Sequence, residues 1–180
     1  IQPGSTVLVL GGGVIGLLTV QLAKLAGANV MLATRNKAKR DLALRLGATA
    51  VIDPAATDIT AEIQSLSHGG ADVVMECAGV PETVEQAPKL ARPGGRVVIV
   101  GVLAQGLKVQ YEPFDLLFRE IDIRTSFLNP YTHHRAADLI ANGRIEIEPL
   151  ISRRASLDEV PEIVANPPGA GEVKVLAVPG

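Results

Sequence analysis

Cysteine, net charge and long apolar runs are all scarce in this chain of 180 residues. Its single cysteine, Cys77, excludes an internal disulfide and a zinc site made of this chain's cysteines alone, and it fits a reducing compartment. The formal charge of −2 gives no general attraction to nucleic acid or to anionic membranes. Lys24 interrupts the longest apolar run, and no signal peptide precedes the first predicted strand. We therefore expect a cytoplasmic protein.

The composition is that of an ordinary globular chain. A hydrophobic content of 47% over 180 residues is enough for one well-buried domain with an appendage. The chain starts with Ile1 and not with methionine, and an apolar strand follows almost at once. We therefore expect the sequence to be a piece of a longer protein.

Three glycines occur where an apolar strand, residues 7–10, leads into a long apolar helix, residues 14–26. In a dinucleotide-binding turn the first glycine makes the tight turn, the second admits a pyrophosphate, and the third lets the helix pack on its strand. The helix N-terminus then holds the phosphates with its N–H groups. The candidate residues are Gly11, Gly13, Val14, Ile15 and Gly16. The alternative is a glycine-rich turn without a ligand.

Further apolar runs predict a series of parallel strands. They occur at residues 30–33, 50–52, 73–75 and 97–100, and helical stretches separate them. The fold class expected is α/β, a doubly wound parallel sheet of the Rossmann type. A last run at residues 121–124 alternates apolar with charged residues, which is typical of a strand near an edge.

Two other patterns concern helices. The predicted helix over residues 14–26 has an almost wholly apolar surface, so we expect it also to contact another domain or subunit. Near the end of the chain, Ser156 and Glu159 have capping-box spacing for a helix over residues 156–165. The pair Pro167-Pro168 should stop this helix, and a final strand is expected at residues 173–178.

The end of the second strand bears on the choice of cofactor. An NAD-binding sheet places a carboxylate there for the ribose, but no Asp or Glu occurs between Gly11 and Asp41. Thr34 can donate a hydroxyl to a 2′-phosphate, and Arg35 can bind it with two hydrogen bonds. Lys39 or Arg40 would add a second positive contact. The sequence therefore favours NADP(H) over NAD(H), the alternative being an ordinary solvated start of a helix.

Taken together, several motifs resemble the cofactor-binding half of the zinc-containing medium-chain alcohol and polyol dehydrogenases, and the sorbitol, butanediol and threonine dehydrogenase branch is nearest. The motifs are Gly11-Gly-Gly-Val-Ile-Gly16, Glu76-Cys-Ala-Gly79, Gly94-Gly-Arg-Val-Val-Ile-Val-Gly101, Phe114-Asp-Leu-Leu-Phe-Arg-Glu120, Pro149-Leu-Ile151 and Gly171-Glu-Val-Lys-Val175. The resemblance covers essentially the whole chain. It implies a Rossmann NAD(P)-binding domain over residues 1–145 and, over residues 146–180, a segment that completes the catalytic domain of the longer enzyme.

The resemblance also implies further cofactor contacts at the strand ends. These are Cys77 and Ala78 along the adenosine and ribose, Val100 and Val102 beside the nicotinamide, backbone groups of Ser126 and Leu128 at the carboxamide, and Lys174 near the pyrophosphate.

The family's zinc ligands and proton-relay residues belong largely to an N-terminal domain that this chain lacks. Cys77, His68, His133 and His134 do not have the spacing of the family's zinc motif. Adjacent histidines on a helix point about 100° apart, which makes them poor co-ligands. No base can be named beside Cys77, so the chain offers no evident nucleophile. We therefore expect no catalytic residue and no metal site in this chain, which alone should bind cofactor without turnover.

The implied reaction is hydride transfer between NADP(H) and a secondary alcohol or ketone, with zinc supplied by the missing domain. Two alternatives stay open: a zinc-free quinone or enone reductase of the same superfamily, and a non-catalytic NADP(H)-binding module. A methyltransferase, which also uses a glycine-rich turn after its first strand, is a remote third alternative. We also expect a homo-oligomer, with residues 104–111 as a possible edge strand or else a surface loop.

Overall fold

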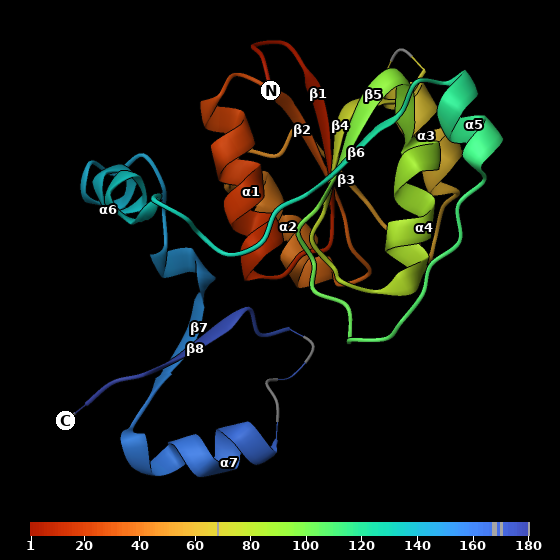
Figure 1. Ribbon diagram of the computed structural model, residues 1–180. Coiled ribbons are helices and arrows are strands. Elements are labelled where there is room, and N and C mark those ends of the chain that lie inside the picture. The colour runs from red at the N-terminus through yellow and green to blue at the C-terminus, as the bar shows by residue number, and fades with distance from the viewer. Residues whose placement is uncertain (68, 167–168, 170, 180) are drawn as a thin grey trace.

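The six-stranded sheet at the centre of the molecule is entirely parallel (Figure 1). It is seen in a computed structural model that describes residues 1–67, 69–166, 169 and 171–179. Its strands are β1 Thr6–Leu10, β2 Asn29–Ala33, β3 Ala50–Ile52, β4 Ala71–Glu76, β5 Ala91–Ile99 and β6 Asp122–Thr125. Their order is β3-β2-β1-β4-β5-β6, which confirms the predicted doubly wound α/β fold. β6 lies at an edge, as its alternating pattern predicts.

Helices cover both faces of the sheet (Figure 1). The covering helices are α1 Val14–Leu25, α2 Lys37–Arg45, α3 Ile59–Leu66 and α4 Pro81–Leu90. Further along the chain come α5 Pro113–Phe118, α6 His133–Ala141 and α7 Val160–Ala165. Alternate residues of β1 enter two separate cores because successive strand side chains point to opposite faces. Val7 and Val9 pack with α1 and α2, whereas Leu8 and Leu10 pack with α3 and α4. This double burial explains why the strand is apolar at each of residues 7–10.

Two helix-to-strand joints repeat nearly the same sequence, Leu25-Ala-Gly-Ala28 and Leu46-Gly-Ala48, which predicts a glycine that closes each helix in the left-handed conformation. The two joints have this geometry. Gly27 and Gly47 both have positive φ, at +84° and +104°. After each glycine, the next residue's N–H reaches back to the helix, Ala28 to Ala23 O and Ala48 to Ala43 O. These caps make the connections from α1 to β2 and from α2 to β3 short.

The structure differs from the sequence-based expectations at two places. β5 begins at Ala91, six residues before the expected start, because Ala91 pairs with Ala71 across a register shift that accommodates the glycines. Residues 104–111 form no strand. Their chain runs over α4, where the Gln110 N–H donates to Glu85 and the Tyr111 hydroxyl to the Val84 carbonyl.

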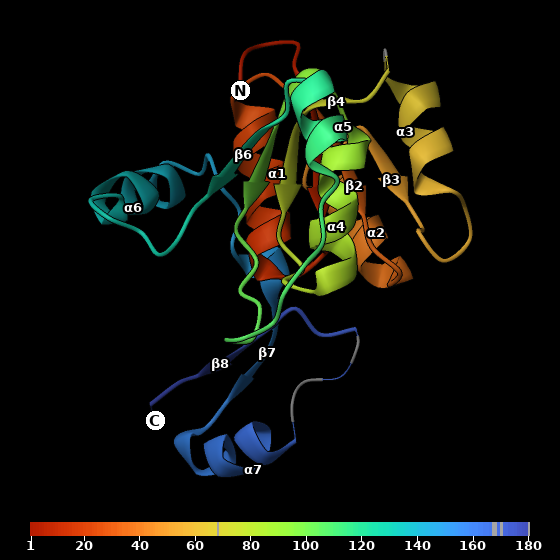
Figure 2. The same cartoon turned by 45° about the vertical axis from the view of Figure 1, so that its right-hand side comes forward.

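The C-terminal segment forms a separate two-stranded sheet, β7 Ile151–Ala155 with β8 Lys174–Ala177. In both views this sheet and α7 extend beyond the edge where the six strands end (Figures 1 and 2). Ser156 and Glu159 form the predicted capping box, and the helix starts with a 3₁₀ turn before α7. The pair Pro167-Pro168 lies outside the described residues. Within the described part of the chain, no helix is long and apolar enough to cross a membrane.

A buried glutamine attaches this segment to the Rossmann sheet. The Gln21 side chain, 7% exposed on α1, accepts from the Glu146 N–H at 2.7 Å and donates to the Glu146 carbonyl at 2.9 Å. Leu150 follows and is buried in the core beside α1 and α2. The backbone of Glu146 is thus fixed to α1 before the chain continues towards β7.

Candidate cofactor-binding site

The glycine turn lies at the carboxyl end of β1, between β2 and β4. β1 pairs with both strands, and the chain reverses its strand order between β1 and β4. In open α/β sheets the crevice outside such a switch point is where ligands bind. The Gly11 N–H donates to the Ala33 carbonyl at 2.9 Å, which fixes the turn to the end of β2.

Two of the three glycines are required by packing. Gly11 has φ +104°, and a Cβ there would lie 2.9 Å from the Ala78 nitrogen. A Cβ on the buried Gly16 would overlap the Gly11 carbonyl oxygen. Both positions therefore need glycine for the turn to close and for α1 to pack against it, whether or not a ligand binds.

Gly13 is different, because packing does not explain it. It is exposed, its φ of −76° suits any residue, and a Cβ there would meet no atom within 4 Å. Gly13 is also the N-cap of α1, and no described side chain caps that helix or places a carboxylate in its first turn. The N–H groups in the first turn of α1 thus have no side-chain cap among the described residues, and the N-terminus of a helix in this state is suited to bind an anion.

The predicted 2′-phosphate residues lie directly beside this turn. A Cβ on Gly12 would come 3.0 Å from Thr34 Cγ2 and 3.1 Å from Lys39 Cβ. Arg35 is exposed, and its guanidinium has no ion-pair partner among the described residues. The structure therefore brings Thr34, Arg35 and Lys39 together at the end of β2.

Arg40 is engaged in the loop itself. Its Nη1 donates to the carbonyls of Thr34 and Arg35 at 2.7 and 2.8 Å, and its Nη2 pairs with Asp53 at 2.9 Å. The side chain is only 16% exposed. Asn36 caps α2 by accepting from the Lys39 N–H. These contacts hold the Thr34–Arg35 backbone, and they neutralise the carboxylate at the end of β3.

Cys77 and Ala78 follow the last residue of β4. The Cys77 N–H donates to the Leu10 carbonyl, and its sulfur lies 3.8 Å from the Thr19 hydroxyl. Burial raises the pKa of the Cys77 thiol to about 11, despite the Thr19 contact, which lowers it; the nearby Glu76 charge raises it further. A thiol with this pKa is protonated at neutral pH, consistent with the absence of a nucleophilic role.

Glu76 is a residue that the sequence analysis missed as part of the site. It is the last residue of β4 and is fully buried. In the sequence it served only as part of the family motif Glu76-Cys-Ala-Gly79. Its Oε1 accepts from the N–H groups of Ala78 and Gly79 and from the Thr83 hydroxyl, at 2.8, 2.9 and 2.8 Å. The signal in the sequence was a carboxylate directly after the apolar run at residues 73–75.

The residues expected around the nicotinamide lie at the ends of the next two strands. Val100 follows β5 and Val102 is 73% exposed. The Ser126 N–H extends the pairing of β6 by donating to the Ile99 carbonyl, and Leu128 has a left-handed φ of 58°. These residues share the carboxyl edge of the sheet with the glycine turn. Lys174 does not, because it begins β8 in the separate two-stranded sheet.

The described residues contain no group of three or more His, Cys, Asp or Glu side chains arranged to hold a metal ion. His133 and His134 are neighbours at the start of the exposed helix α6, and His68 lies outside the described residues. The side chains present therefore do not fit a zinc site.

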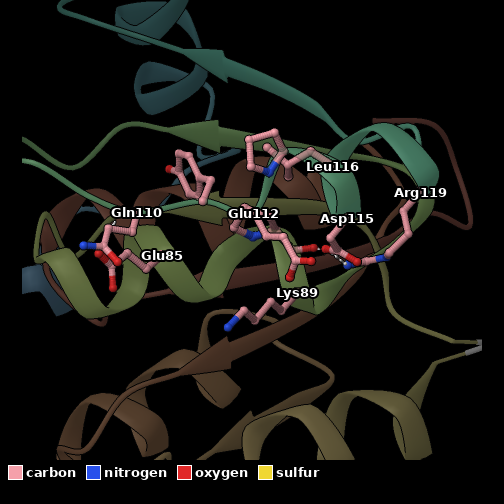
Figure 3. A pocket seen from close by; sticks show the side chains of 10 residues that line it. Glu85, Lys89, Gln110, Glu112, Asp115, Leu116 and Arg119 are labelled. Carbon is pink, nitrogen blue, oxygen red and sulfur yellow. Dashed lines mark hydrogen bonds and ion pairs between the residues drawn. The ribbon is translucent and has the colours of Figure 1, made fainter.

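A hollow of about 630 Å³ lies at α4 and α5. Figure 3 shows the side chains that line it. Glu85, Lys89, Glu112, Asp115 and Arg119 contribute charges of both signs to its lining. The Arg119–Asp115 ion pair visible there spans 3.0 Å. None of the cofactor candidates lines this hollow, so it is separate from the glycine turn.

A family model described as "Zinc-binding dehydrogenase" matches residues 14–142, which begin at Val14 within the glycine turn and include the strand ends that carry most of the candidates. The chain belongs to this family. Among solved structures, a zinc-binding dehydrogenase of Sinorhizobium meliloti 1021 bound to NADP is 59% identical, with a TM-score of 0.94. The match covers 99% of this chain and 54% of that one.

Two curated relatives of this zinc-binding dehydrogenase chain are from the sorbitol, butanediol and threonine dehydrogenase branch, which its motifs resemble. A Bacillus subtilis sorbitol dehydrogenase is 32% identical over 88% of this chain and 45% of its own. A Neisseria gonorrhoeae (R,R)-butanediol dehydrogenase is 30% identical with the same two coverages. The chain thus spans about half the length of these relatives and corresponds to their cofactor-binding part.

Proposed function

We propose that this chain is the NADP(H)-binding part of an enzyme that transfers a hydride between the nicotinamide and a secondary alcohol or ketone. The observation that carries this proposal is the open cradle at Gly13 beside the unpaired Arg35. When bound, NADP(H) supplies the hydride donor or acceptor, and this chain binds and orients it.

In this proposal the start of α1 binds the pyrophosphate. Gly13, Val14 and Ile15 present N–H groups to it, and the positive end of the helix dipole adds to the attraction. Gly11 and Gly16 shape the turn without contacting the phosphates through a side chain. Lys174 stays a proposed pyrophosphate contact, and the small sheet that carries it would have to lie against this edge in the longer protein.

Thr34, Arg35 and Lys39 would bind the 2′-phosphate, and Arg40 would hold their loop through its contacts with the Thr34 and Arg35 carbonyls. A hydrogen bond between charged groups contributes about 1.5–3 kcal/mol. One such contact from Arg35 favours NADPH over NADH by roughly ten- to a hundredfold.

At the other end, Val100 and Val102 would flank the nicotinamide, and backbone groups of Ser126 and Leu128 would bind its carboxamide. Cys77 and Ala78 would line the ribose and adenosine. None of these side chains carries a proton suited to catalysis, so the remaining chemistry, including the zinc, is proposed to come from a catalytic domain outside this chain.

An apolar hollow supports the idea that a further domain packs on α1. It measures about 510 Å³ and lies between α1 and α6. It is lined by Leu18, Leu22, Thr132, Arg135, Ala136, Leu139, Ile140 and Ile145. α6 has no buried residue despite its apolar side, so both helices lack a partner here. We propose that the catalytic domain covers this hollow.

We also propose a homo-oligomer formed at the β6 edge of the sheet. The neighbouring α5 exposes Phe114, Leu117 and Phe118 by at least 70% each, and the two phenylalanine rings stack at 5.9 Å. A free strand edge beside such a patch favours association with a second copy. The single cysteine supports a reducing compartment, and we propose the cytoplasm.

The test is a side-by-side titration of the purified chain with NADPH and NADH at low salt, repeated with Arg35→Ala. We expect tighter NADPH binding that weakens as salt increases, and loss of the preference in Arg35→Ala. Equal binding of the two cofactors would remove the 2′-phosphate site. A chelator experiment on the full-length enzyme tests the zinc, since activity that survives complete metal removal would refute it.

A further inference from the structure

The Glu76 carboxylate is buried at the carboxyl edge of the sheet, where the cofactor candidates lie. One of its oxygens accepts several hydrogen bonds, and the other accepts none from the described residues. Oε1 accepts three hydrogen bonds, from Ala78, Gly79 and Thr83. Oε2 is buried and has no hydrogen-bond partner among the described residues. It is covered by Gly101, where an added Cβ would lie only 2.5 Å from it.

The same residue joins two loops at the carboxyl edge. Its side chain holds the loop after β4, and its main-chain carbonyl accepts from the N–H groups of Val100 and Gly101, both at 2.9 Å, at the end of β5. The two loops touch, because a Cβ on Gly79 would lie 2.9 Å from the Val102 nitrogen. Glu76 therefore fixes the loops of β4 and β5 relative to each other.

The loop after β4 also touches the glycine turn. Ala78, whose N–H binds Glu76, is the residue against which Gly11 packs. One carboxylate thus connects the turn proposed for the pyrophosphate with Val100 and Val102, proposed for the nicotinamide. A displacement of that carboxylate would change the spacing between the two ends of the cofactor site.

A buried charge with an unpaired oxygen costs free energy, so stability alone does not account for it. Asp72, at the amino end of the same strand, shows what a stabilising carboxylate looks like here. It is partly exposed and uses both oxygens, accepting from the Thr6 N–H and pairing with Arg92, each at 2.7 Å. Of the two carboxylates on β4, only Glu76 faces the cofactor edge.

We propose that Glu76 is a positioning residue that sets the distance between the pyrophosphate turn and the nicotinamide loops. The inference rests on the proposed function. It adds Glu76 to the cofactor site as a residue that acts through the loops and without contacting the cofactor. Glu76→Gln keeps the shape and one acceptor oxygen. It removes the charge that strengthens three hydrogen bonds, so the two loops are held less firmly.

The experiment compares wild type, Glu76→Gln, Thr83→Val and the matched control Asp72→Asn in titrations with two probes. NADPH spans the whole site, whereas 2′-phospho-ADP-ribose lacks the nicotinamide. We expect Glu76→Gln to bind NADPH about tenfold more weakly, the loss expected for one charge-assisted hydrogen bond, and to bind the truncated probe nearly as wild type does. Thr83→Val should weaken NADPH binding by a smaller factor in the same direction. Asp72→Asn should lower the melting temperature without changing either affinity.

If Glu76→Gln binds NADPH as tightly as wild type does, the positioning role is overturned. It is also overturned if Glu76→Gln loses the same affinity for both probes, or if Asp72→Asn loses as much NADPH affinity as Glu76→Gln. If Glu76→Gln does not fold, Thr83→Val decides, and unchanged NADPH binding in that variant refutes the proposal. If the wild-type chain binds neither probe, the proposed function fails and the role of Glu76 with it. If wild type binds NADPH and neither Glu76→Gln nor Thr83→Val changes that affinity, only the role of Glu76 is refuted.

Discussion

The backbone nitrogen of Ala78 lies 2.9 Å from the position that a Cβ on Gly11 would take. This contact between the end of β1 and the end of β4 closes the floor of the switch-point crevice. The fold therefore requires glycine at Gly11 and also at Gly16, whereas it does not require glycine at Gly13 of the same motif.

The first prediction uses this difference. Gly16→Ala should lower the free energy of unfolding by at least about 2 kcal/mol, because the methyl group overlaps the Gly11 carbonyl. Gly13→Ala should cost about 1 kcal/mol or less as an N-cap change, but it should weaken NADPH binding about tenfold. Urea unfolding and cofactor titration measure the two effects. Unaltered NADPH affinity in Gly13→Ala would contradict the pyrophosphate site.

The second prediction separates two arginines of the β2 end. Arg40→Met leaves two carbonyls and Asp53 without their donor, so it should cost about 1–3 kcal/mol of stability. Arg35→Met should leave the melting temperature unchanged, because Arg35 is exposed and has no described partner, yet it should weaken NADPH binding and not NADH binding. Thermal melts with and without each cofactor test both variants. A stability loss in Arg35→Met would show that this side chain is structural.

Much of this region followed from the sequence because its signals are local. The apolar strand, the glycine spacing, the left-handed Gly27 and Gly47 and the missing carboxylate after β2 all depend on residues close together in the chain. Glu76 and Arg40 were harder to interpret. Their partners, such as Gly101 and Asp53, are brought near only when separate strands align in the sheet.

The same reason explains the two differences in the fold. The first half of β5 contains Pro93, Gly94 and Gly95, which are typical of a turn, yet the pairing of Ala91 with Ala71 extends the strand through them. Residues 104–111 alternate in a way that suits a strand, but they pair with none of the described strands, and Glu85 on α4 accepts from the Gln110 N–H. In each case tertiary pairing outweighs local preference.

The third prediction concerns Cys77. Because burial raises its pKa to about 11, the thiol should react slowly with iodoacetamide or a disulfide reagent at pH 8, and quickly after unfolding in urea. The rate should rise with pH well above 8. Rapid modification of the folded chain at pH 7 would contradict the buried, protonated thiol.

The fourth prediction is a pH dependence of stability from Asp72. Burial raises the pKa of this carboxyl, but the Thr6 N–H and the Arg92 guanidinium together outweigh burial and hold the pKa below its ordinary value of 3.8. A depressed pKa stabilises the fold above the unfolded-state value and loses that contribution as the pH falls through the folded-state value. The stabilisation should therefore be complete near neutral pH and decline below about pH 4.

Asp72→Asn should remove this part of the acid dependence. Its free energy of unfolding should be lower than that of wild type at pH 7, and the difference should shrink as the pH approaches 3. Urea unfolding over this range provides the measurement. A difference between the two proteins that is constant with pH would show that the carboxylate charge does not contribute.

The last prediction concerns Gln21, which attaches the C-terminal segment to the sheet through paired hydrogen bonds with the Glu146 backbone. Gln21→Leu keeps the bulk of the side chain but leaves the two partly buried backbone groups of Glu146 without this partner, at a cost of about 1–3 kcal/mol. The loss should be local, so amide hydrogen exchange should quicken from residue 146 onward while β1 and β4 stay protected. NADPH affinity should not change, because Gln21 lies two turns from the start of α1. Gln64→Leu, on the exposed side of α3, is the matched control and should alter neither property. Uniformly faster exchange throughout the sheet would show instead that Gln21 stabilises the whole domain, and that the C-terminal segment is not an independently opening unit.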